Sequence, residues 1–204
     1  MNKPEADFFV TFPVTLPGQW QAVLDEDDFL PAPPLKNWLL DKQSLTARLK
    51  ACSQHFHVQV IGEHEQTCSL EDSSALIAVG TPILVREVLL VCDNVPQVFA
   101  RSILPLSSLT GSEQALAHLG NQPLGQVLFN NPTLSRQGLE VSAFSADAGV
   151  ARLAKNLITQ LPNDNVIWTK PLWGRRSIFM INNKPLMVAE VFLPSAYAYY
   201  RAHA

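Results

Sequence analysis

Apolar and polar positions along the chain follow two spacings, and the helical spacing appears first. Apolar residues recur near a period of about 3.6 from Leu35 to Leu49, and Ser44 stands where it can cap a second helix. We therefore expect two helices with a kink over 41–44. Two further helices are predicted over 112–119 and 146–161, because Gly120 and Pro162 follow them as stop signals.

Strand-like alternation fills most of the remaining chain. Strands are predicted over 56–61, 83–92, 95–104, 134–144, 177–182 and 186–193. The pairs Asp93-Asn94 and Asn182-Asn183 are typical of tight turns between neighbouring strands. Because short turns join the strands and no strand–helix–strand alternation occurs, we expect an α+β fold, an antiparallel β-sheet with helices packed on one face.

Residues 1–33 follow neither spacing. Several prolines bracket an acidic cluster at 25–28 in this part of the chain. We expect an N-terminal arm over 1–33 that wraps the protein and contains one short helix, and a single domain over 34–204.

Composition then narrows the class of protein. Hydrophobic residues make up 47% of the 204, which excludes a disordered chain, and a formal net charge of −3 does not favour nucleic-acid binding. No apolar run approaches the ~20 residues of a membrane-spanning helix, and the first residues do not resemble a signal peptide. The three cysteines are widely spaced, which favours a reducing compartment. We expect a cytoplasmic monomer without nucleic-acid partner or membrane span.

Two charged residues interrupt otherwise apolar strand faces. Arg86 shares a face of 83–92 with Val88 and Leu90, and Glu190 is the only charge over 186–193. An acid in such a place is costly unless it is paired or kept neutral. The pattern leaves two alternatives open. Arg86 and Glu190 form a structural ion pair, or they line a pocket in which Arg86 binds an anion and Glu190 exchanges a proton or a hydrogen bond with a substrate.

Other candidate groups carry less information. Arg175 and Arg176 are predicted to point to opposite faces of a strand. An adjacent pair of arginines is typical of a solvated edge or of salt-bridge partners, and the alternative is a site that attracts a dianion. His55, His57 and His64 lack a fourth ligand at a familiar spacing, so we expect no metal site there. The sequence also lacks the G-x-S-x-G, H-E-x-x-H, G-x-G-x-x-G and nucleotide-loop motifs.

Four segments resemble the chorismate pyruvate-lyase family, and they occur in the family's order. They are VREVLL at 85–90, LGNQPLG at 119–125 followed by Leu128-Phe129, LWGRRS at 172–177, and PLMVAEVFLP at 185–194. The resemblance spans about residues 35 to 194. It implies an α+β fold with an antiparallel sheet and a cofactor-free carbon–oxygen lyase. The implied reaction converts chorismate to 4-hydroxybenzoate and pyruvate for ubiquinone biosynthesis.

The resemblance also implies roles for individual residues. The family's ligand-binding arginine falls on Arg86 and its acid on Glu190, while main-chain groups of Leu124 and Leu45 bind substrate or product. An arginine suits the ring carboxylate because its fork binds both oxygens and stays charged when desolvated. Arg175 or Arg176 is the candidate for the second carboxylate of chorismate.

The chain departs from compact members of that family in its arm and in an extra segment at about 145–170. One alternative is a ligand-sensing domain of the same fold that binds a small aromatic or cyclic acid without catalysis. However, residues 1–33 are too short, acidic and proline-rich for the winged DNA-binding region of such regulators. A second alternative is a lyase that makes 3-hydroxybenzoate. Magnesium-dependent chorismate enzymes rank low because the predicted elements carry no suitable group of acids.

Overall fold

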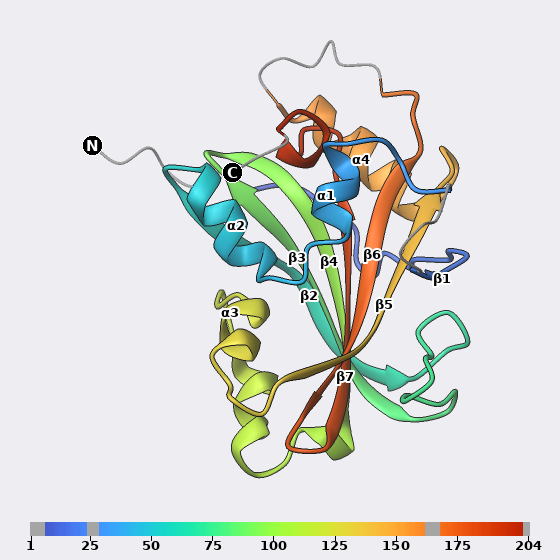
Figure 1. Cartoon of the computed structure of the whole chain (residues 1–204), viewed down its shortest axis with the longest axis vertical. Helices are drawn as coiled ribbons and strands as arrows, with labels where there is room; N and C mark the ends of the chain where they lie inside the picture. The colour runs from blue at the N-terminus through green and yellow to red at the C-terminus, as the bar shows by residue number, and fades with distance from the viewer. Residues whose placement is uncertain (1–6, 24–28, 162–167, 202–204) are drawn as a thin grey trace.

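A seven-stranded antiparallel sheet forms the centre of the protein in the order β1-β5-β6-β7-β4-β3-β2 (Figure 1). The structure is a computed structural model that describes residues 7–23, 29–161 and 168–201. The strands are β1 (Gln21–Ala22), β2 (Phe56–Thr67), β3 (Pro82–Cys92), β4 (Val95–Pro105), β5 (Ser135–Phe144), β6 (Leu172–Ile181) and β7 (Lys184–Phe192). The helices are α1 (Leu35–Leu39), α2 (Leu45–Cys52), α3 (Leu124–Phe129) and α4 (Gly149–Thr159), with 3₁₀ turns η1 (Leu106–Ser108), η2 (Gly111–His118) and η3 (Tyr197–Tyr199). The α+β architecture and its antiparallel sheet are confirmed.

Local sequence signals explain several element boundaries. The Oγ atom of Ser44 accepts a hydrogen bond from the Ala47 N–H at 3.3 Å, so the predicted cap does start α2 after a break from α1. Asp93 and Asn94 have positive φ angles of 50° and 64°, which close the β3–β4 hairpin with the right-handed twist that its strands need. The pair Asn182-Asn183 closes β6–β7 in the same way.

Different helices cover the two faces of the sheet. On one face, α1, α2 and α3 pack over side chains such as Val88, Leu90 and Val188. On the opposite face, α4 packs with Phe8, Val14 and Leu16 of the arm over residues that include Leu89, Val91 and Phe99. The expectation of helices on one face therefore holds for α1, α2 and α3, whereas α4 covers the other face.

Other elements differ from the sequence-based expectation in length or type. The helix predicted over 112–119 is the 3₁₀ turn η2, and β2 and β6 are longer than predicted. Leu124, for which no helix was predicted, begins α3 directly after Pro123. Residues 7–23 and 29–33 contain no helix, and the remainder of the predicted arm, 1–6 and 24–28, lies outside the described residues. No helix in the described part of the chain is long and apolar enough to cross a membrane.

Candidate active site

A pocket lies between the sheet and the helices α2 and α3. It occupies the boundary between two apolar clusters on the same face, one beneath α1 and α2 and the other beneath α3. Its apolar walls include Val88, Leu90, Leu128, Phe179 and Val188. Concave pockets with mostly apolar walls and a few converging polar groups are typical of small-ligand sites.

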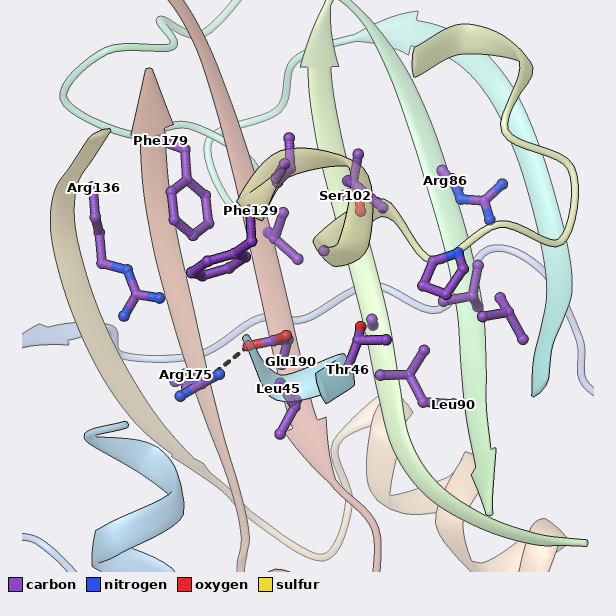
Figure 2. Close-up of a pocket in the computed structure, with 18 residues that line it drawn as sticks. Leu45, Thr46, Arg86, Leu90, Ser102, Phe129, Arg136, Arg175, Phe179 and Glu190 are labelled. Carbon is purple, nitrogen blue, oxygen red and sulfur yellow. Dashed lines mark hydrogen bonds and ion pairs between the residues drawn. The ribbon is translucent and has the colours of Figure 1, made fainter. Parts of the chain in front are cut away.

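The charged lining residues come from four strands of the sheet. They are Arg86 on β3, Glu190 on β7, Arg175 on β6 and Arg136 on β5, and Figure 2 shows Arg86 and Arg136 on opposite sides with Glu190 between them. The strand register explains this spread. Arg86 lies opposite Ser102 of β4, which in turn lies opposite Val188 of β7. Glu190 lies two residues further along β7, opposite Ala100 and Arg175.

Arg86 is buried, with only 2% of its side chain exposed. Its Nη1 atom donates to Glu63 on the edge strand β2, and its Nη2 atom donates to the carbonyl oxygens of Gly120 and Gln122 at 2.8 and 3.2 Å. Arg86 and Glu190 do not form the ion pair that was one of the two alternatives, because β4 lies between their strands in the sheet. The residues instead line one pocket, as the second alternative required.

Glu190 forms its ion pair with Arg175. The Nε atom of Arg175 donates to Glu190 Oε2 at 2.7 Å, and its Nη1 atom donates to the carbonyl oxygens of Trp38 and Asp41 at 2.9 and 2.6 Å. Arg175 has 2% of its side chain exposed, and Glu190 has 16%. Arg175 therefore holds the acid against the sheet and ties it to the α1–α2 segment above the pocket.

Arg176 does not reach the pocket. Side chains alternate along β6, so Arg176 points to the opposite face, where it pairs with Glu140 and stacks over the ring of Trp20 at 5.0 Å. Its guanidinium is thus separated from the pocket by the sheet, and Arg176 is ruled out as the contact for a second carboxylate at this site.

Leu45 and Leu124 share a structural position. Leu45 is the first residue of α2 and Leu124 is the first residue of α3, and both line the pocket. The N–H groups in the first turn of a helix have no acceptor within that helix, and they carry partial positive charge. The first residues of the two helices therefore lie at the wall of the pocket, where their N–H groups are candidate main-chain donors. Gly125 keeps the helices close, because a Cβ atom there would lie 3.1 Å from Thr46 Oγ1.

Arg136 was missed by the sequence analysis. Its Nη2 atom donates to the carbonyl oxygen of Lys42 at 3.3 Å, and its guanidinium lies 5.1 Å from the centre of the Phe179 ring. Its Nη1 atom is buried and has no hydrogen-bond partner among the described residues. A β-bulge in β5 between Arg136 and Gly138 turns Arg136 to the same face as Leu139 and Val141, against strict alternation.

Glu63 was missed for a similar reason. A bulge in β2 between Val60 and Gly62 places Glu63 opposite Arg86. Strict alternation from Val58 and Val60 would have turned this carboxylate to the other face. A single sequence does not show where a bulge occurs. The only signal at these two bulges is a glycine, Gly62 in β2 and Gly138 in β5.

Comparison with known proteins gives a consistent family assignment. The sequence model described as chorismate lyase matches residues 18–203. A protein of Psychromonas ingrahamii named probable chorismate pyruvate-lyase is 44% identical over 165 residues, covering 81% of this chain and 85% of the relative. A protein of Pseudoalteromonas translucida with the same name is 39% identical and covers 93% of this chain and 99% of the relative.

Solved structures share the fold at much lower sequence identity. The effector domain of PhnF from Mycobacterium smegmatis has a TM-score of 0.52 at 17% identity, with 76% of this chain and 91% of that domain covered. This likeness concerns the arrangement of the sheet and helices alone.

Proposed function

The chain belongs to the chorismate lyase family, and from this premise we propose that it converts chorismate to 4-hydroxybenzoate and pyruvate. We further propose that the reaction takes place in the cytoplasm and supplies the aromatic ring for ubiquinone biosynthesis. One observation carries the proposal for this particular pocket. A buried arginine and a partly buried acid, from strands separated by β4, line a single apolar chamber beneath two helix starts.

In this proposal Arg86 and the main-chain donors of α2 and α3 bind the ring carboxylate. An arginine has five N–H groups, and the hydrogen bonds of Arg86 to Glu63, Gly120 and Gln122 occupy three of them among the described residues. The remaining N–H groups, with those of Leu45 and Leu124, suit an anion that must leave water. Glu63 fixes the orientation of the guanidinium in the absence of substrate.

The reaction itself requires the loss of a proton and the breaking of one carbon–oxygen bond. The ring carbon that bears the hydroxyl group loses its hydrogen as a proton, and the neighbouring ether bond breaks with its electrons going to the enolpyruvyl oxygen. The enolpyruvate then takes up a proton at its methylene carbon and becomes pyruvate. Formation of an aromatic ring drives these steps. Glu190 is placed to hydrogen-bond the ring hydroxyl or to serve the departing oxygen, while Val88 and Val188 pack against the ring.

The test is a spectrophotometric assay of the purified protein with chorismate, with and without a chelator. We expect 4-hydroxybenzoate absorbance to rise with one equivalent of pyruvate, which lactate dehydrogenase detects, and the chelator to leave the rate unchanged. Chromatography of the product separates 4-hydroxybenzoate from 3-hydroxybenzoate. Saturable binding of chorismate without any product would contradict the proposal and favour a ligand-sensing domain.

A further inference from the structure

The three arginines of the pocket differ in their charge partners. Arg86 pairs with Glu63, and Arg175 pairs with Glu190. Arg136 forms no ion pair with any carboxylate of the described residues, and its buried Nη1 atom has no hydrogen-bond partner there. An unpaired cation in a partly dehydrated site is costly, and an anionic ligand would remove that cost.

The surroundings of Arg136 point its charge toward the pocket. The pKa of its guanidinium is lowered by burial and by the nearby charge of Arg175, with Glu190 and Asp41 opposing this effect. Asp41 is engaged with Arg48 at 2.9 Å, and Glu190 is engaged with Arg175. Phe179 stacks on the guanidinium and keeps it beside the cavity (Figure 2).

The positions of the arginines also favour a ligand with two negatively charged groups. Three guanidiniums line the pocket, and two carboxylates, Glu63 and Glu190, pair with them. Arg86 and Arg136 stand at the two ends, on β3 and β5. A ligand with a carboxylate at each end would therefore meet one arginine at each, and a ligand with a single carboxylate would meet only one.

We propose that Arg136 binds the enolpyruvyl carboxylate of chorismate and so distinguishes the dicarboxylate substrate from the monocarboxylate product. This inference rests on the proposed function and extends it by naming the second carboxylate subsite. Arg136 keeps its proton throughout. When the carbon–oxygen bond breaks, the carboxylate that it holds leaves with the enolpyruvate, and 4-hydroxybenzoate retains no group for Arg136. The sequence analysis named Arg175 as a candidate for this role. In the structure its guanidinium instead donates to Glu190 and to carbonyl oxygens of the α1–α2 segment.

The test compares Arg136→Gln with the full-length wild type in two measurements. One is kcat/KM for chorismate, and the other is the Kd for 4-hydroxybenzoate by titration calorimetry. We expect kcat/KM to fall by roughly 10²-fold, mainly through KM, as for loss of one partner of a desolvated charge pair. The Kd for 4-hydroxybenzoate should stay within about threefold, and Arg136→Lys should restore part of kcat/KM because it keeps the charge.

Controls separate binding from folding. Arg152→Gln, at an exposed arginine of α4, should match the wild type in both measurements. Should Arg136→Gln fail to fold, Arg136→Lys provides the same comparison, with a rise in KM that exceeds any change in product affinity. Equal loss of chorismate turnover and 4-hydroxybenzoate binding would overturn the inference, as would no change in either. Absence of turnover in the wild type would instead overturn the proposed function, and this inference with it.

Discussion

Arg175 and Glu190 face each other in the register of β6 and β7, and the arginine Nε atom lies 2.7 Å from the acid's Oε2 atom. The same guanidinium holds the carbonyl oxygens of Trp38 and Asp41. One buried side chain thus connects the candidate acid with the α1–α2 segment. Both the orientation of Glu190 and the closure of that end of the pocket therefore depend on Arg175.

Substitution of Arg175 should therefore affect stability and turnover at once. We expect Arg175→Gln to lower the free energy of unfolding by about 3–5 kcal/mol, because it leaves a partly buried carboxylate unpaired. Turnover of chorismate should fall as well. Urea unfolding of Arg175→Gln, Glu190→Gln and the double variant measures their coupling, which for contacting residues is about 0.5–3 kcal/mol. Additive effects would show that the two side chains act independently.

Glu190→Gln tests proton transfer. The amide keeps the size of the side chain and much of its hydrogen bonding, but it cannot exchange a proton. If Glu190 transfers a proton, kcat should fall by ~10²–10⁴-fold. The initial rate of 4-hydroxybenzoate formation at saturating chorismate measures this. A rate near that of the wild type would leave Glu190 with a positioning role only.

Arg86→Ala should weaken substrate and product alike. We expect the loss to be about 2–5 kcal/mol in binding free energy, as for the removal of one partner of a buried charge pair. Calorimetry with 4-hydroxybenzoate measures it directly. Because Glu63 loses its partner in this variant, the double variant Arg86→Ala with Glu63→Gln serves as a control for misfolding. Affinity like that of the wild type in either variant would remove Arg86 from the site.

On the opposite face, Arg101 joins the sheet to the arm. It pairs with Glu87 and Asp72, and Glu87 in turn accepts the N–H of Val14 at 2.8 Å. We expect Arg101→Met to cost about 3–5 kcal/mol of unfolding free energy, since two buried acids lose their cation. Denaturation curves measure the loss, with Arg152→Gln as the surface control. Recovery in the triple variant that also carries Glu87→Gln and Asp72→Asn would confirm uncompensated charge as the cause.

The η2 turn carries an acid whose protonation should weaken the fold at low pH. Hydrogen bonds from Lys184 at 2.6 Å, Ser112 and Asn182 lower the pKa of Glu113 from 4.5 to about 2. A lowered pKa means that the folded state favours the ionised form. This stabilisation is complete above pH 4.5 and is lost as the pH falls toward 2. Thermal unfolding at several pH values should show a shallower acid-side decline for Glu113→Gln, and identical curves would contradict this prediction.

Sequence patterns were most informative where side-chain alternation was regular. Arg86 and Glu190 stand on unbroken stretches of β3 and β7, so period-two counting placed both on the pocket face. The same counting placed Arg175 and Arg176 on opposite faces of the sheet. It could not show which residue pairs with which, because the strand order and register that place Arg175 opposite Glu190 arise from long-range packing.

The residues that escaped prediction lie next to breaks in that alternation. Glu63 follows a bulge in β2, and Arg136 precedes one in β5. Each bulge reverses the facing of the charged residue relative to its apolar neighbours. The helix α3 was missed because it is only six residues long and follows a proline, so its sequence shows no helical periodicity.

The location of α4 bears on how this chain can change in length. The described part of the extra segment at 145–170 packs on the face away from the pocket, and it joins β5 to β6 beyond their paired residues. Residues can be added or removed there without shifting the register of any strand. A single deletion within β7, in contrast, would exchange Glu190 for a neighbour on the opposite face. The length of this connection can therefore vary between related proteins as long as the core beneath α4 stays covered. The strands tolerate the exchange of side chains but not the insertion or deletion of residues.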